Sequence, residues 1–294
     1  LADVRAWFER YPFTCFEQRA STAIGLGDRK RWDALMRTLP DFLDKDGLVK
    51  YFTLLSTGDD VLTSYVLAVA DAAGWKIPDE SRERMEQGLV AFVEGRVVRY
   101  SPLPTADLAI RKIAALSALA RGKQGFKAAW LDSIAIEPNL WPTSAVIDWY
   151  QLLSRVPSLP KRAERLAEAT RILRSRLNFQ GTRLTLSTEK SDALWWLMVS
   201  ADSNANRLLL AVADAPDWKA DLPRLVTGAL GRMQQGRWNT TVANAWGVLA
   251  LDRVSRVLEA TPVTGTTTAS LGAERFDYRW QEGSAASTFA RRLA

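Results

Sequence analysis

The sequence repeats a pattern in which a Ser or Thr introduces an apolar, alanine-containing segment. Five such segments follow one another at intervals of about 40–50 residues, a spacing typical of helical hairpins with their loops. Their leading threonines are Thr63, Thr105, Thr143, Thr188 and Thr240. A hydroxyl at such a place can cap a helix by accepting from the free amides of its first turn. With the segment that follows Cys15, the pattern predicts six buried helices.

More polar, amphipathic segments separate these six. They cover residues 30–43, 79–93, 123–134 and 161–177, and then 204–212 together with 222–233. In residues 79–93, acids fill the first turn and apolar residues share one face, as on an outer helix. Inner helices that alternate with polar outer helices predict an all-α fold, an (α/α)6 toroid of six helical hairpins over residues 1–260.

The composition changes after residue 260. Residues 262–272 are rich in β-branched side chains, and residues 274–280 alternate polar and aromatic ones. This pattern is typical of strands. We therefore predict that residues 261–294 form the start of a flanking β-domain.

Composition excludes several kinds of site. The chain of 294 residues has no histidine, so no histidine-based catalysis or histidine-ligated metal can operate within it. A single cysteine excludes an intrachain disulfide and a multi-cysteine zinc site. We expect neither a metal nor a cofactor.

The net charge of +6 does not by itself indicate a nucleic-acid partner. The basic residues of 161–177 alternate with glutamates, which favours a solvated outer helix over a binding groove. The longest apolar runs are too short to cross a bilayer. We predict neither nucleic-acid binding nor membrane insertion for this chain.

The only cysteine, Cys15, is followed three positions later by Gln18. On a helix these positions share a face, so the thiol and the carboxamide can approach each other. A thiol that displaces ammonia from such a carboxamide gives an internal thioester, which must be protected from water. Tyr11, Phe13 and Phe16 could supply an aromatic shield. The alternative is a lone cysteine that simply packs in the core.

The run YPFTCFEQ at residues 11–18 resembles the thioester motif of the alpha-2-macroglobulin and complement superfamily, and most closely its bacterial branch. A second run, GRWNTTVANAWGVLAL at residues 236–251, is similar to a late helix of the same thioester domains. The resemblance implies the thioester domain of a bacterial alpha-2-macroglobulin, and a CUB-like β-domain for the C-terminal strands.

The resemblance also implies a protease inhibitor and not an enzyme. Cleavage of a bait region would expose the thioester, and lysine amines of the protease would attack the Gln18 acyl carbon in a single turnover. Because complement members use a histidine to reach hydroxyl acceptors, and this chain has none, we expect a preference for amines. The implied partners are proteases and the other domains of the parent protein.

The resemblance implies a periplasmic location and leaves open whether the parent is anchored to the inner membrane. Residues 1–8 already form an amphipathic pattern without signal-peptide features, and the chain ends within a predicted strand. We therefore expect a fragment of a longer protein.

Two further residues are candidates near the site. Glu17 either supports the motif by orienting the turn or is an ordinary acid of a first helical turn. Tyr100 precedes an inner helix, and the first turns of inner helices gather at one end of a toroid. We expect the tryptophans, such as Trp195, Trp196 and Trp246, to lie mostly in the core.

The residues are also compatible with two other classes of function. The first is an (α/α)6 enzyme that acts on a carbohydrate or an isoprenoid, with an acid and base pair drawn from loop carboxylates. These carboxylates are Asp59, Asp60, Asp107, Glu189 and Asp192. The second is a scaffold whose Cys15 and Gln18 are inert.

Overall fold

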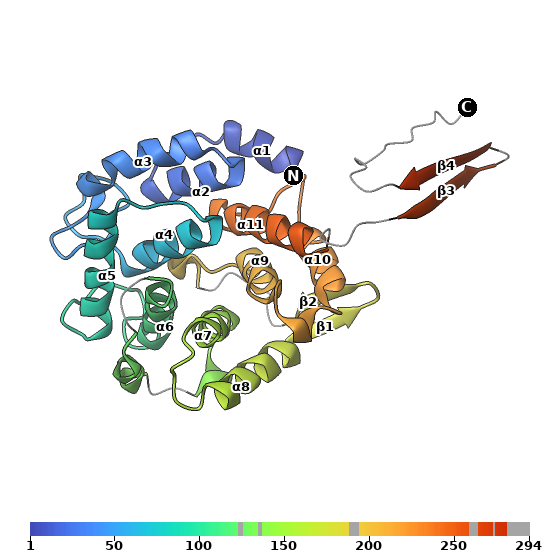
Figure 1. The fold of residues 1–294 in the computed structure, drawn as a ribbon. Helices are drawn as coiled ribbons and strands as arrows, with labels where there is room; N and C mark the ends of the chain where they lie inside the picture. The colour runs from blue at the N-terminus through green and yellow to red at the C-terminus, as the bar shows by residue number, and fades with distance from the viewer. Residues whose placement is uncertain (123–125, 135–136, 188–193, 259–263, 273, 281–294) are drawn as a thin grey trace.

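Six helices form a closed inner ring (Figure 1). The computed structural model describes residues 1–122, 126–134, 137–187, 194–258, 264–272 and 274–280. The ring consists of α2 (Phe16–Leu26), α4 (Asp60–Ala73), α6 (Leu108–Leu119), α7 (Thr143–Arg155), α9 (Ala201–Val212) and α11 (Thr241–Leu258). Each contacts the next, and α11 returns to contact α2. The predicted all-α fold with a short C-terminal β-segment is confirmed.

Outer helices surround this ring. They are α1 (Ala2–Glu9), α3 (Arg29–Phe42), α5 (Asp79–Val93), α8 (Arg162–Ser175) and α10 (Leu222–Leu230). The two layers differ in burial as their patterns predict: the inner helix α7 buries eleven of its 13 residues. Its outer neighbour α8 buries only three of its 14, Ala169, Ile172 and Leu173.

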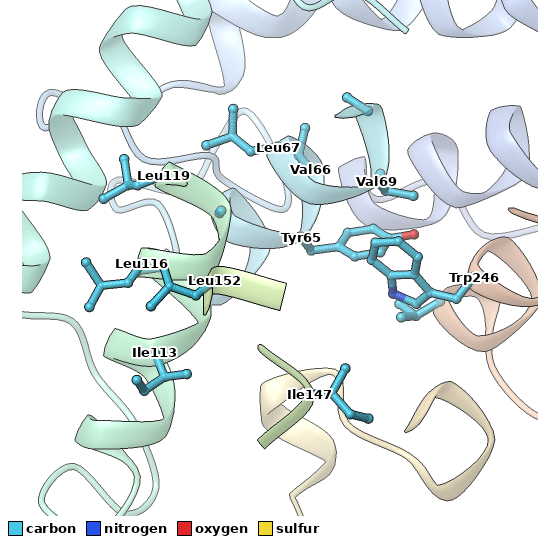
Figure 2. Close-up of a cluster of buried hydrophobic side chains, with 14 of the residues drawn as sticks. Tyr65, Val66, Leu67, Val69, Ile113, Leu116, Leu119, Ile147, Leu152 and Trp246 are labelled. Carbon is cyan, nitrogen blue, oxygen red and sulfur yellow. The ribbon is translucent and has the colours of Figure 1, made fainter. Parts of the chain in front are cut away.

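The core lies where the inner helices meet (Figure 2). Tyr65 of α4 and Trp246 of α11 meet edge to face with ring centroids 5.9 Å apart. Aliphatic side chains of α6 and α7, such as Leu116 and Leu152, complete this buried cluster. The main stabilisation of the fold is therefore apolar burial between inner helices.

The first five inner helices point the same way, because each is followed by an outer segment that returns the chain. One hollow is accordingly lined by the residues that begin α2, α4, α9 and α11. Another hollow is lined by the residues that end α4, α6, α7 and α9. The two ends of the ring are thus chemically different, and Cys15 lies at the end where the helices begin.

The fifth inner helix was predicted wrongly. We expected it to begin at Thr188, with residues 204–212 as part of an outer helix. Thr188 lies outside the described residues, and Trp195–Leu197 forms only a 3-10 turn, η3. The inner helix is α9, which begins after Ser200, and Ser200 and Ser203 cap it reciprocally. The outer role belongs to α10 alone.

The outer helix predicted over residues 123–134 is also not formed. Its described part contains the 3-10 helix η1 (Ala128–Ser133), and a short 3-10 turn η2 (Pro138–Leu140) precedes α7. A further 3-10 turn, η4 (Pro216–Trp218), precedes α10. Buried Trp130 anchors the η1 segment, and its indole N–H donates to Glu94 Oε1 at 3.1 Å. The outer layer is therefore less regular than six hairpins.

Only one leading threonine acts as a helix cap in the described structure. The Thr240 hydroxyl accepts from the Ala243 amide at 3.0 Å. Asp59 caps α4 in place of Thr63, with its carboxylate 2.7 Å from the Leu62 amide. The recurrence located four of its five helices, but the residues directly before α4, α6 and α7 are Asp59, Asp107 and Pro142 and not the leading threonines.

Two antiparallel hairpins complete the described structure. β1 (Leu177–Gln180) pairs with β2 (Arg183–Leu186) within the helical region, and the sequence pattern did not predict this hairpin. β3 (Gly265–Leu271) pairs with β4 (Glu274–Trp280) and projects from the ring, as predicted for the C-terminal segment (Figure 1). Among the described helices, none has both the length and the apolar character of a membrane span.

Candidate functional site

Cys15 and Gln18 lie in a cleft of about 830 Å³ at the end of the ring where the inner helices begin. Five separate parts of the chain form its walls: α1 with the segment after it, the first turn of α2, the loop before α4, the turn before α9 and residues 237–242. Cys15 is 8% exposed, so the thiol is covered but still belongs to the lining. The lone cysteine is therefore placed in a site and not in the middle of the core.

The two residues are held together by a reciprocal cap. Cys15 is the N-cap residue of α2, with extended backbone angles, and its sulfur faces the amide of Gln18. The Gln18 side chain folds back, and its Oε1 accepts from the Cys15 amide at 3.1 Å. Such a box satisfies two amides that a helix otherwise leaves free. It also sets the thiol beside the carboxamide that it would attack.

Tyr11 holds the other end of the carboxamide. Gln18 Nε2 donates to the Tyr11 hydroxyl at 3.4 Å, and Tyr11 lines the cleft. Its ring packs on Trp7 with centroids 4.7 Å apart, which fixes its position. Burial first, and then the Glu17 carboxylate, raise the pKa of the Tyr11 phenol. Tyr11 therefore stays a neutral hydrogen-bonding group beside Gln18.

The other two aromatic residues of the predicted shield do not line the cleft, although the Phe13 ring packs edge-on against that of Tyr11 with centroids 5.5 Å apart. Phe13 is 63% exposed. Phe16 is fully buried in the main core, 4.9 Å from Phe42 between ring centroids, and does not line the cleft. Helix geometry explains this, because the residue after an N-cap points to a different face from the cap itself. Tyr100 is 87% exposed and is likewise not part of the lining.

Glu17 is the most buried acid of the cleft. Its Oε1 accepts from Ser21 Oγ at 2.6 Å and from Thr241 Oγ1 at 2.8 Å. Ser21 in turn shares a hydrogen bond of 2.6 Å with the Tyr65 hydroxyl. The network joins α2 to α4 and α11, so Glu17 does more than an ordinary first-turn acid. Burial raises its pKa, although the two hydroxyl donors act against this.

The surroundings make the Cys15 thiolate unfavourable. Burial raises the pKa of the Cys15 thiol, and the Glu17 carboxylate adds to this rise. The amides of Gln18 and Glu17 act in the opposite direction. A thiol with a raised pKa is a poor leaving group, so a thioester at this place would be less reactive than one in water.

Sequence reasoning missed Tyr51 and the role of the loop that carries it. Tyr51 lines the cleft, and its backbone carbonyl accepts from the Phe16 amide at 2.9 Å. Burial and the neighbouring acids raise the pKa of its phenol. Tyr51 comes from a loop between helices, and no pattern in the sequence indicates that this loop returns to the first turn of α2.

Most of the described loop acids have structural partners, which speaks against the free acid and base pair of a glycoside hydrolase. Asp60 accepts from Arg111 Nε at 2.9 Å and from its Nη2 at 2.5 Å, and all these atoms are buried. Asp107 lies 3.6 Å from Arg111 Nη1 and accepts from Trp196 at 2.9 Å. Asp59 caps α4. Glu189 and Asp192 lie outside the described residues.

No group of acids or cysteine within the described residues has the geometry of a metal site. Trp246 is in the core as predicted, and Trp196 is partly buried at the cleft. Trp195 is a correction, because it is 71% exposed. It lies in the turn η3, where the predicted inner helix does not form.

Comparison with solved structures gives the fold a precedent. A structure of native Escherichia coli alpha-2-macroglobulin matches over 95% of this chain with a TM-score of 0.64 and 20% identity. One of the Escherichia coli protein activated by porcine elastase covers 92% at a TM-score of 0.61 and 18% identity. One of Salmonella alpha-2-macroglobulin reacted with methylamine covers 95% at a TM-score of 0.63 and 19% identity.

This chain has the fold of a part of bacterial alpha-2-macroglobulins. It spans 18%, 25% and 19% of those three chains, respectively. No protein-family model matches the sequence, and no curated protein is significantly similar to it. The similarity to alpha-2-macroglobulins is therefore one of fold, and the residues of the cleft are the evidence for the chemistry of Cys15 and Gln18.

Proposed function

We propose that this chain is the thioester domain of a bacterial alpha-2-macroglobulin. The observation that carries the proposal is the reciprocal cap of Cys15 and Gln18 at the first turn of α2, within a cleft that leaves Cys15 only 8% exposed. The fold supports it, as does the description of a Salmonella structural neighbour as reacted with methylamine. The proposal has three parts: membership of the alpha-2-macroglobulin family, a thioester between Cys15 and Gln18, and the use of that bond to capture proteases.

The bond forms when the Cys15 sulfur attacks the Gln18 side-chain carbon and ammonia leaves. The Cys15 amide, 3.1 Å from Gln18 Oε1, is placed to stabilise negative charge on that oxygen. An amine later attacks the same carbon, an amide forms, and Cys15 is released as a thiol. Each chain acts once, so the domain is an inhibitor component and not an enzyme.

In the parent protein the amine would come from a lysine of an attacking protease. One structural neighbour is described as activated by elastase, which fits a trigger by proteolysis. We propose that other domains of the parent, which include a CUB-like domain continuing from β3 and β4, cover the cleft until that moment. We also propose a periplasmic location, as the resemblance to bacterial alpha-2-macroglobulins implies.

Intact mass spectrometry tests the proposal directly. The untreated protein should be lighter than its sequence by one ammonia, and methylamine should add one methylamine and release one free thiol. Cys15→Ala should show neither change. An intact, folded parent protein that forms no adduct with methylamine would contradict the proposal and favour an inert scaffold.

A further inference from the structure

Transfer of the acyl group to an amine requires one proton to move from the attacking nitrogen to the departing sulfur. Histidine commonly performs such transfers, and this chain has none. Within the described cleft, the carboxylates of Glu17 and Asp59 are the available acceptors. The remaining question is which of the two is placed to serve both atoms.

Glu17 has one carboxylate oxygen held and one available. Both of its hydrogen bonds, from Ser21 and Thr241, end on Oε1. No donor of the described residues reaches Oε2, and Glu17 belongs to the cleft lining with 8% of its surface exposed. Oε1 therefore fixes the side chain, and Oε2 is left for a molecule in the cleft.

Glu17 also belongs to the same helical turn as both reacting groups. It lies between Cys15 and Gln18 in the sequence, and its charge acts on the Cys15 thiol. Asp59 belongs to the loop before α4, where its Oδ1 caps that helix. Burial and then the neighbouring Asp60 raise the pKa of Asp59 to about 6, so Asp59 could also accept a proton. Its charge is not among those that act on the Cys15 thiol, and its place in a different loop separates it from Glu17. The phenols that face Glu17, those of Tyr11, Tyr51 and Tyr65, are kept protonated by burial and cannot accept a proton at neutral pH.

We propose that Glu17 carries the proton from the attacking amine to the Cys15 sulfur. This inference rests on the thioester function proposed above. A neutral amine attacks the Gln18 acyl carbon, and Oε2 of Glu17 takes the proton from the new ammonium nitrogen. The carbon–sulfur bond then breaks, and Glu17 gives the same proton to Cys15. The products are an amide, a thiol and the original carboxylate.

The reverse sequence describes how the bond forms. Glu17 takes the proton of the Cys15 thiol as its sulfur attacks Gln18, and then gives it to the departing ammonia. Burial of the carboxylate makes it a stronger base than a solvated one. The other charges of the cleft are Asp59 and Arg237, so an amine enters an environment with more acidic than basic groups.

The experiment follows methylamine incorporation in the thioester-containing protein as a function of pH, at a constant concentration of the neutral amine. The wild-type rate should fall as the pH is lowered and Glu17 becomes protonated, and this fall is the acidic limb of the pH profile. Glu17→Gln keeps the acceptor for Ser21 and Thr241, and we expect it to slow incorporation about 100-fold and to abolish the acidic limb. Asp59→Asn, which still caps α4, should keep that limb.

Thr241→Val gives an independent test that leaves the carboxylate in place. Loss of the Thr241 donor removes a hydrogen bond that lowers the pKa of Glu17, so the acidic limb should move to higher pH. Thr240, not Thr241, caps α11, so this variant is expected to fold. If Glu17→Gln does not form the thioester, its incorporation rate cannot be measured, and Thr241→Val then tests the role of Glu17.

Two outcomes overturn the inference. One is an acidic limb that persists unchanged in Glu17→Gln, and the other is a limb that Thr241→Val does not move. A limb lost in Asp59→Asn would assign the proton transfer to Asp59 instead. Failure of the thioester function looks different, because the wild-type mass would then show no loss of ammonia and no adduct at any pH.

Discussion

At the scale of single residues, the cap of α2 and the candidate reactive pair are the same two side chains. Ser, Thr, Asp and Asn are the preferred N-cap residues, and none of them carries a nucleophile as strong as a thiol. Cys15 is a weaker cap because sulfur is a weak acceptor. The helix therefore gives up part of the stability of an oxygen cap, and the gain is a thiol aligned with Gln18.

Cys15→Ser and Cys15→Ala should separate capping from chemistry. Both variants should lose the methylamine adduct. Relative to wild-type protein already opened by methylamine, Cys15→Ala should lower the free energy of unfolding by about 0.5–1 kcal/mol, whereas Cys15→Ser should equal or exceed the wild type. Urea unfolding measures both. A Ser variant as unstable as the Ala variant would show that Cys15 does not act as a cap.

At the scale of elements, the loop before α4 is fixed from one buried acid. Asp44 accepts from the amides of Leu48 at 2.9 Å and Gly58 at 2.7 Å, and Arg99 Nη2 lies 2.6 Å from it. These contacts close a loop whose ends pair through Leu43, Val49 and Asp59. Tyr51 and Asp59 reach the cleft because this loop is closed.

Asp44→Asn should remove an acid-sensitive part of the stability. Burial alone would raise the pKa of Asp44, but the hydrogen bonds from Gly58, Leu48 and Arg99 outweigh it and lower the pKa. The stabilisation is therefore complete above about pH 4, the unfolded value, and is lost as pH falls through the lower folded value. We expect the variant to be about 3 kcal/mol less stable at pH 7.

Urea unfolding of both proteins between pH 7 and pH 3 checks this prediction. The difference in unfolding free energy between wild type and Asp44→Asn should shrink as the pH decreases. A constant difference would mean that the Asp44 charge does not stabilise the loop.

The contact between α1 and α2 depends on a glycine. A β-carbon on Gly25 would lie 2.0 Å from Phe8 Cε2, so α1 could not keep its place. We expect Gly25→Ala to destabilise the protein by about 1–3 kcal/mol, despite the better helix propensity of alanine. Thr22→Ala in the same helix should be nearly neutral, and thermal unfolding compares the two. Equal stability of Gly25→Ala and wild type would show that α1 is easily displaced.

At the scale of the whole molecule, the ring and the C-terminal hairpin are separate in space (Figure 1). The main core draws most of its residues from the inner and outer helices, with others from loops, 3-10 turns and Leu186 of β2. No described residue of β3 or β4 belongs to it. Stability of the ring should therefore not depend on the hairpin. A two-stranded hairpin by itself is only marginally stable in water.

A chain that ends at Leu258 should keep the cooperative unfolding and the midpoint temperature of the full sequence. Circular dichroism during heating measures this, and Gly25→Ala supplies a variant for which the midpoint does fall. A lower midpoint or a broader transition in the shortened chain would show that the hairpin contributes to the ring, and that the proposed boundary near residue 260 is misplaced.

The sequence by itself determined what depends on local geometry. Residues three apart on a helix always share a face, so the proximity of Cys15 and Gln18 and the alternation of buried and polar helices could be predicted. The tertiary structure decided the contacts between distant segments. It brought Thr241 to Glu17, 224 positions away, and it paired Arg111 with Asp60. It also turned Phe16 into the core and began the fifth inner helix after Ser200, because packing among helices, and not local periodicity, selects these contacts.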